Sequence, residues 1–208
     1  MFVLAGHTSS VTCFLLLGEV LVSGSTDKSL RFWNLKKGEC ILHLPNSHES
    51  SIKCLVDIGD EKFCSGGNDR FLRIWSYQGT LIGVIERQEE ENLHCLLAIS
   101  NKRIVTGSNS SLLHTYNTET MKFISFFTNH RESVRCLVNI NEELFASASL
   151  DGVIVVWKSD LSPCRTLSYP EKFDSKFYSC SVNDLLVLQE QLALGMASKS
   201  STSTLEIK

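Results

Sequence analysis

The sequence predicts an all-β fold assembled from repeated units of four short strands. Cys13, Cys54, Cys95 and Cys136 follow one another at intervals of 41 residues, each within a similar phrase. A fixed period of this length indicates one structural unit copied along the chain. Within each unit, short apolar runs alternate with Gly, Ser, Asn and Asp, which is typical of antiparallel strands. No window carries a sustained helical period.

Each unit contributes three strand-like phrases, and the third ends on an aromatic residue. In chain order they are Val11–Phe14, Leu21–Asp27 and Leu30–Trp33; Ile52–Leu55, Phe63–Asp69 and Leu72–Trp75; Leu93–Leu96, Ile104–Gly107 and Leu112–Tyr116; Val134–Leu137, Leu144–Ser147 and Val153–Trp157. A fourth apolar run follows each aromatic residue, at Cys40–Leu44, Thr80–Ile85, Lys122–Phe127 and Cys164–Leu167. Four short strands in about 40 residues are typical of the blades of a β-propeller.

Polar residues stand at fixed distances before the aromatic residue. Six residues before it lie Asp27, Asp69, Ser110 and Asp151, and ten before it lie Ser23, Ser65, Thr106 and Ser147. Such constant offsets indicate side chains that meet in three dimensions.

The first unit carries a family resemblance. Gly6-His7, the Ser-Gly-Ser-Thr-Asp phrase at 23–27 and Phe32-Trp33-Asn34 resemble a WD40 repeat, with Asn34 where Asp is usual. The resemblance covers about 1–170 well and 171–208 weakly. It implies that the His, Ser, Asp and Trp of a blade form one hydrogen-bonded chain. The implied sets are His7, Ser23, Asp27 and Trp33; His48, Ser65, Asp69 and Trp75; and His130, Ser147, Asp151 and Trp157.

The third unit departs from this pattern. It has no His at the expected place, Ser110 replaces Asp and Tyr116 replaces Trp, so that Thr106 alone remains. We expect this blade to depend on packing and to be the softest of the first four. The nearby acidic run Glu86, Glu89, Glu90 and Glu91 is expected to keep a loop solvated.

We expect one propeller domain over 1–208, with repeats at about 4–44, 45–85, 86–127 and 128–168 and a degenerate fifth at 173–208. Met1–Leu4 stands where the family commonly has a ring-closing strand, and it could pair with Thr204–Ile207. Two architectures stay open: a closed ring of five blades, or part of a larger propeller, commonly of seven blades in this family. An open arc would allow oligomerisation.

Composition excludes several classes of function. A net charge of −3 argues against binding of nucleic acid through bulk charge. The apolar stretch Val11–Val22 contains Glu19 and has no basic leader, so we expect neither a signal peptide nor a membrane span. The eight cysteines include no Cys-x-x-Cys, and equivalent cysteines of neighbouring blades lie too far apart for a disulfide. We expect no metal or cofactor, and a reducing compartment, cytosol or nucleus.

The Ser, His and Asp of each set match a hydrolase triad in composition. The same trio recurs three times at constant offsets from a Trp, which favours a structural role. A propeller hydrolase would instead need carboxylates, histidines or a metal site outside the repeated sets, and the sequence shows none. We therefore expect no enzyme activity.

By resemblance, partners bind on the rim formed by the loop before the first strand and the turn between the second and third strands. The expected contact residues are Ser10, Thr12, Thr26, Ser51, Lys53, Asn68, Asn92, His94, Asn109, Ser133, Arg135 and Leu150. Lys53, His94 and Arg135 are equivalent positions that can carry positive charge, and clustered cations favour an acidic or phosphorylated peptide. The alternative is an ordinary solvated surface.

The expected function is therefore non-covalent: a platform that docks partner proteins. The alternative within the same class is a substrate-recognition subunit in ubiquitin transfer, which would need an adaptor-binding segment such as an F-box, and none precedes residue 1. Docking on a membrane surface would need a basic cluster larger than Lys36-Lys37.

Overall fold

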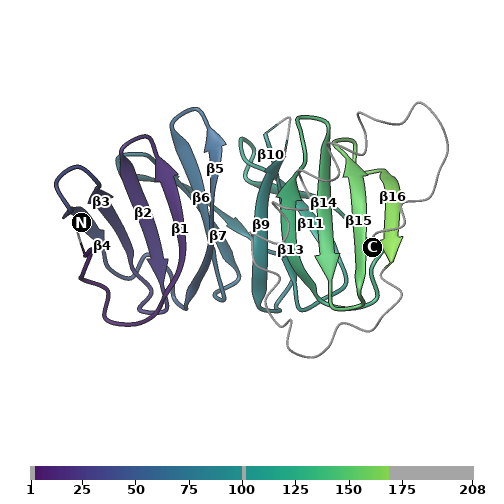
Figure 1. Ribbon diagram of the computed structural model, residues 1–208, viewed down its shortest axis with the longest axis horizontal. Coiled ribbons are helices and arrows are strands. Elements are labelled where there is room, and N and C mark those ends of the chain that lie inside the picture. The colour runs from purple at the N-terminus through teal and green to yellow at the C-terminus, as the bar shows by residue number, and fades with distance from the viewer. Residues whose placement is uncertain (1–2, 100–101, 169–208) are drawn as a thin grey trace, which may run out of the picture.

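The computed structural model describes residues 3–99 and 102–168, which form four antiparallel sheets of four strands each (Figure 1). Blade one holds β1 (Val11–Leu17), β2 (Val20–Ser25), β3 (Leu30–Asn34) and β4 (Glu39–Leu44). Blade two holds β5 (Ile52–Gly59), β6 (Lys62–Gly67), β7 (Phe71–Ser76) and β8 (Leu81–Glu86). Blade three holds β9 (Leu93–Ile99), β10 (Arg103–Ser108), β11 (Leu113–Asn117) and β12 (Lys122–Phe127). Blade four holds β13 (Val134–Asn139), β14 (Leu144–Ser149), β15 (Val153–Lys158) and β16 (Pro163–Ser168). The predicted all-β architecture is confirmed.

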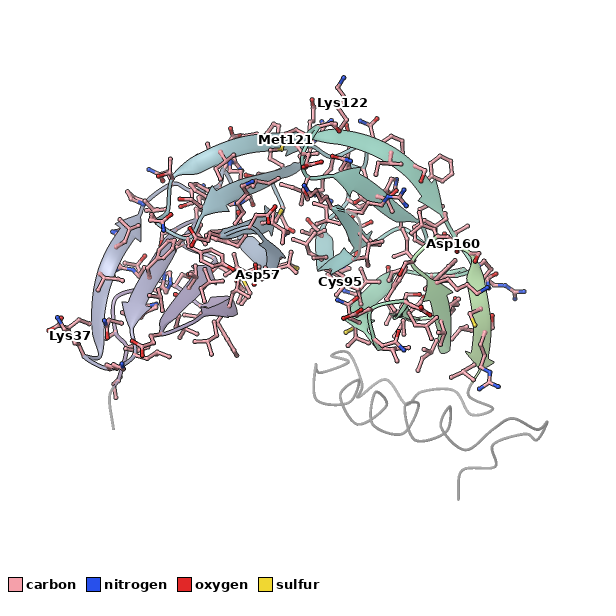
Figure 2. The ribbon with its side chains drawn as sticks, turned by 90° about the horizontal axis from the view of Figure 1, so that it is seen from above. Lys37, Asp57, Cys95, Met121, Lys122 and Asp160 are labelled. Atoms are coloured by element: carbon pink, nitrogen blue, oxygen red, sulfur yellow. The ribbon has the colours of Figure 1, made fainter. Side chains whose placement is uncertain are left out.

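The sheets fan out around a common centre. Strands follow one another in chain order within each sheet, and the first strands of successive blades contact one another. Figure 2 shows the four blades as an open arc, with Cys95 of β9 at the inner side and Met121 and Lys122 at the outer side. The first strand of each blade therefore lines the centre, and the fourth lies on the perimeter.

The aspartates of the repeated sets shape the turn between the second and third strands. Oδ1 of Asp27 accepts the backbone N–H of Ser29 at 2.9 Å, and Oδ1 of Asp151 accepts that of Val153 at the same distance. The residue between each of these pairs adopts positive φ, 71° at Lys28 and 76° at Gly152. An Asp side chain that accepts from the backbone two residues later is a common way to form a tight turn.

The core lies between the blades. Ile52, Leu93 and Val134 begin the first strands of blades two, three and four, and all three are completely buried. All three face a glycine of the preceding blade at close range: an added Cβ would lie 2.7 Å from Cγ2 of Ile52 at Gly24 and 2.9 Å from Cγ1 of Val134 at Gly107, and at Gly66 it would collide with Cδ2 of Leu93. Burial of such apolar surface drives the blades together.

Val11 occupies the equivalent position in blade one but is 54% exposed, because the described residues form no blade before it. Val3 and Leu4, from the predicted closing strand, belong to no strand. Residues 1–2 and the predicted fifth repeat at 173–208, including its Thr204–Ile207 strand, lie outside the described residues.

The described cysteines are all free thiols, and several brace the centre of the fan. The thiol of Cys54 donates to the carbonyl of His94 in the next blade at 3.3 Å. Burial raises the pKa of the Cys13 thiol to about 11 and raises those of Cys54 and Cys95 further. These thiols therefore stay protonated at neutral pH and have little nucleophilic character. The described part of the chain contains no helix long and apolar enough to cross a membrane.

Candidate partner-binding rim

The two loop classes that sequence reasoning assigned to the rim are tied together in every described blade. In each blade, the first residue of the turn between the second and third strands donates its backbone N–H to a backbone carbonyl. The acceptor is the residue immediately before the first strand. The four bonds run from Thr26 to Ser10 (2.9 Å), from Asn68 to Ser51 (3.0 Å), from Asn109 to Asn92 (3.2 Å) and from Leu150 to Ser133 (3.0 Å). All eight of these residues were predicted to contact partners, and the repeated bond places them on one rim.

The other four predicted residues lie at equivalent positions on the first strands of the four blades and form a row: Thr12, Lys53, His94 and Arg135. Thr12 uses its hydroxyl to join blades one and two, since Oγ1 lies 2.5 Å from the carbonyl oxygen of Ile52. In the third blade, His94 Nε2 lies 2.5 Å from Oδ1 of Asn109. Arg135 of blade four reaches back to His94, with Nη1 2.9 Å from Nε2 and 3.2 Å from Nδ1. The row therefore joins neighbouring blades at the centre of the rim.

A shallow groove opens in this row. It has a volume of about 280 Å³ and is lined by Thr12, Lys53, Asn68, Asn92, Leu93 and His94. Only Leu93 is absent from the predicted contact set. The groove combines one cation, three further polar side chains, one imidazole and one buried apolar residue, a composition suited to a peptide with an acidic side chain.

The cations of the row lack acidic partners. Several other basic residues pair with a carboxylate: Lys36 with Glu19, Arg70 with Glu86 and Glu90, Arg73 with Asp69, Arg87 with Glu89 and Lys102 with Glu119. Within residues 3–99 and 102–168, neither Lys53 nor Arg135 forms such a pair. Nε of Arg135 is also buried without a hydrogen-bond partner. Unpaired positive charge beside a groove favours an anionic ligand.

The repeated sets form the implied hydrogen-bonded chain in blades one, two and four. In blade two, Nε1 of Trp75 donates to Oγ of Ser65 at 2.8 Å, and that Oγ lies 2.7 Å from Nε2 of His48. Nδ1 of His48 lies 2.9 Å from Oδ2 of Asp69. Because the indole N–H occupies the hydroxyl oxygen, the serine donates to Nε2 and the neutral imidazole donates from Nδ1 to the carboxylate.

The other two sets match this geometry. The Trp–Ser and Ser–His distances are 2.8 and 2.7 Å for Trp33, Ser23 and His7, and both 2.7 Å for Trp157, Ser147 and His130. The His–Asp distance is 2.9 Å in the first blade and 3.3 Å in the fourth. The serine hydroxyls are buried and occupied on both sides, so these trios act as braces.

In these sets, burial and hydrogen bonding shift the pKa values of His and Asp in opposite directions. Burial raises the pKa of the Asp69 carboxyl, but His48, the Glu49 backbone and Arg73 outweigh it and hold that pKa well below its usual range. Burial lowers the pKa of His48 despite the raising effect of Asp69. It lowers the pKa of His130 in the same way against Asp151. At neutral pH, His48 and His130 are therefore neutral and Asp69 is ionised.

Blade three contains a buried polar network that the sequence analysis missed. Glu89 takes the place of the histidine and accepts from the Thr106 hydroxyl at 2.9 Å and from the Ser108 hydroxyl at 2.8 Å. Nη1 of Arg87 lies 3.2 Å from Oε1 of Glu89, and Nδ1 of His114 lies 3.0 Å from its Oε2.

The expectation that this blade depends on packing alone is therefore wrong, as is the expectation that Glu89 belongs to a solvated loop. Glu89 is buried, and its pKa lies below the ordinary value because His114, Ser108 and Thr106 outweigh the raising effect of burial. The period contained the signal: His7, His48, Glu89 and His130 are each 41 residues apart.

Comparison with known protein families identifies three of the same repeats. The family profile for "WD domain, G-beta repeat" matches residues 1–34, 38–76 and 121–158, which together exceed half of the chain. The chain belongs to the WD40 family. Its third WD40 blade, in which Glu89 replaces the histidine, falls largely outside the matched residues.

Relatives match over short stretches. The chain is 32% identical over 80 residues to the F-box/WD repeat-containing protein sel-10 of Caenorhabditis elegans, which covers 38% of this chain and 14% of that protein. It is 43% identical over 53 residues to Cell division control protein 4 of Saccharomyces cerevisiae, covering 25% of this chain and 7% of that protein. This WD40 chain thus spans a small part of these relatives.

Two solved structures share the fold. The WD40 β-propeller domain of Doa1 superposes with a TM-score of 0.68 at 20% identity, over 81% of this chain and 57% of that one. U3-55K superposes with a TM-score of 0.72 at 19% identity, over 79% and 54% of the two chains. The WD40 arc described here thus matches little more than half of each structure. Among its described residues, no group of three His, Cys, Asp or Glu side chains is arranged to hold a metal ion.

Proposed function

We propose that this WD40 chain is a non-enzymatic platform that docks partner proteins on its rim and takes an acidic or phosphorylated peptide at the Lys53–His94–Arg135 row. The observations that carry the proposal are that Lys53 lines the groove and that neither Lys53 nor Arg135, which contacts His94 beside the groove, has a carboxylate partner among the described residues. Because no described carboxylate neutralises these two cations, an external anion can bind them without displacing an internal partner.

The side chains of the row suit such a ligand. The ammonium of Lys53 offers a compact charge, and the guanidinium of Arg135 can grip two oxygens of a carboxylate or phosphate at once. Oδ1 of Asn68 lines the groove and is buried without a donor. Rotation of the Asn68 side chain into the groove would let Oδ1 accept a backbone N–H of an extended peptide while the cations hold its acidic side chain.

Fluorescence anisotropy with two labelled peptides tests the proposal. The probes are a fluorescein-labelled peptide of alternating Glu and Ser, and the same peptide with phosphoserines. We expect both to bind the wild-type chain, and the Lys53→Glu/Arg135→Glu variant to bind at least about tenfold more weakly. A Lys37→Glu/Arg165→Glu variant makes the same charge change at exposed positions outside the row and should bind as wild type does. Equal loss in both variants would show a general charge effect and contradict the proposal.

A substrate-recognition subunit in ubiquitin transfer is the second candidate, favoured by the match to an F-box/WD repeat-containing protein. On this view the acidic peptide belongs to the substrate. Affinity purification of the natural protein from its cells, followed by mass spectrometry, should then recover ubiquitin-ligase subunits. Their loss in high salt alone would not count against the candidate, whereas their absence at low salt would.

The free thiols support a reducing compartment, cytosol or nucleus, for this platform. Cys40 and Cys164 are exposed and free, the state in which a reducing compartment keeps accessible thiols. Alkylation of cells lysed without reductant should modify the exposed Cys40 and Cys164 in full. Recovery of either cysteine in a disulfide would argue against this location.

A further inference from the structure

His94 lies between the two unpaired cations of the rim. It belongs to β9, whereas Lys53 lies on β5 and Arg135 on β13, so the three residues come from three successive blades. Its side chain is held from the turn that follows β10, where Oδ1 of Asn109 lies 2.5 Å from Nε2. Its backbone carbonyl is held by the thiol of Cys54. The imidazole is therefore fixed at the position where an anion would be bound.

The contacts define one tautomer. Oδ1 of Asn109 can only accept, so Nε2 of His94 carries the proton and donates to it. Nδ1 is then unprotonated, and Nη1 of Arg135 packs against the ring, 3.2 Å from Nδ1 and 2.9 Å from Nε2. A neutral His94 thus links Asn109 to Arg135 and holds the guanidinium in place. A protonated His94 would instead place a positive charge against the same guanidinium.

We propose that His94 is the positioning residue of the anion site and that it takes up a proton when an acidic side chain binds, so that acidic peptides bind more tightly as the pH falls. This inference rests on the proposed docking function and names its regulation. The neutral ring orients Arg135 in the free protein, and the protonated ring adds a third positive group to the complex.

The surroundings of the ring explain the coupling. The charged groups that face it are Arg135 from blade four and Lys53 from blade two; Asn109 contributes only a neutral amide. Burial lowers the pKa of His94, as do Arg135 and Lys53, against the raising effect of Asn109. An anion between the cations compensates their charge, which removes the repulsion that opposes protonation of the ring.

The direction of the effect follows from proton linkage. If the pKa of His94 is higher in the complex than in the free protein, binding takes up a proton between those two values. The affinity then rises as the pH falls through that window and levels off below the free-state pKa. Each unit of difference between the two pKa values corresponds to about a tenfold change in affinity.

The test uses the full chain and the fluorescein-labelled Glu/Ser peptide, whose carboxylates stay ionised above about pH 5.5 and so do not titrate themselves. We expect wild-type affinity to rise by about tenfold between pH 8 and pH 5.5. His94→Gln keeps an amide that can contact Asn109 and Arg135 but cannot be protonated. The affinity of this variant should show no rise between pH 8 and pH 5.5, whatever its value at pH 8.

A control and a direct readout complete the design. His43 is an exposed histidine on the perimeter strand β4, and His43→Gln should retain the wild-type pH dependence. An NMR titration of the His94 ring should show a higher pKa with the peptide bound than without it. A rise in affinity that persists in His94→Gln overturns the inference. Wild-type binding with no pH dependence overturns it while leaving the docking proposal intact, and no peptide binding at any pH overturns both.

Discussion

Glu89 accepts the hydroxyl hydrogen of Thr106 at 2.9 Å, at the place in blade three where histidine meets serine in the other described blades. His114 lies on the opposite side of this carboxylate, two residues before Tyr116, where Arg73 stands before Trp75 in blade two. The carboxylate thus stands at the histidine position, Ser110 stands at the aspartate position, and a buried polar network is retained.

Replacement of Glu89 should destabilise the chain strongly. Glu89→Gln removes the negative charge but leaves the completely buried guanidinium of Arg87 without its counter-ion. Breaking a buried pair in this way costs about 3 kcal/mol or more. Chemical denaturation followed by Trp fluorescence should show a lower midpoint with an unchanged slope.

Glu90→Gln is the matched control, since its carboxylate is exposed and pairs only with Arg70 at the surface. It should change the free energy of unfolding by less than about 1 kcal/mol. Hydrogen exchange should also show β10 and β11 of the wild type protected to the same degree as β6 and β7. Fast hydrogen exchange confined to blade three would mean that the Glu89 network does not stabilise this blade.

The sequence predicts the strands and three of the four braces because each depends on residues of one repeat at fixed offsets. The pairing of β2 with β3 brings Trp33 to Ser23, and His7 joins them from the loop before β1. The polar network of blade three is not predicted by the sequence, because Glu89 differs in residue type from the histidines of the other sets and lies in an acidic run. Its position, 41 residues after His48, is nevertheless the histidine position of the repeat. The contact between Arg135 and His94 depends on how two blades are inclined to each other, which no offset within one repeat encodes.

Removal of the serine hydroxyl from a hydrogen-bonded set should lower the stability of the blade that contains it. Ser65→Ala leaves the indole N–H of Trp75 without its acceptor and His48 without its donor, both in buried surroundings. An unpaired buried polar group costs about 1–3 kcal/mol. Urea denaturation should show this loss, whereas Thr120→Ala, at an exposed turn, should remain within about 0.5 kcal/mol of wild type. Comparable stability of both variants would show that the Ser65 hydroxyl contributes nothing to the blade.

Stability should fall in two stages as the pH is lowered. The pKa values of His48 and His130 are lower in the folded chain than the ordinary value, so their contribution is present above about pH 6.5 and is lost as the pH falls below it. The pKa values of Asp27, Asp69 and Glu89 are also lowered on folding, and their contribution is lost below about pH 4. Thermal unfolding midpoints measured from pH 8 to pH 3 should show both declines. His130→Gln should reduce the slope of the first decline only, and an unchanged slope would exclude His130 as a contributor.

The joint between blades one and two should not tolerate a side chain at Gly24. A Cβ there would lie 2.7 Å from Cγ2 of Ile52 and 2.8 Å from Sγ of Cys13, and Ile52 is completely buried and branched at Cβ, so it cannot turn away. Overpacking of this kind costs about 1–3 kcal/mol. Gly24→Ala should therefore lower the unfolding midpoint in urea. Ile52→Ala alone should also destabilise, through the cavity it leaves, but the double variant should be more stable than the sum of the two losses predicts, because the new methyl group fills part of that cavity. Strict additivity would show that Gly24 and Ile52 do not pack against each other across the joint.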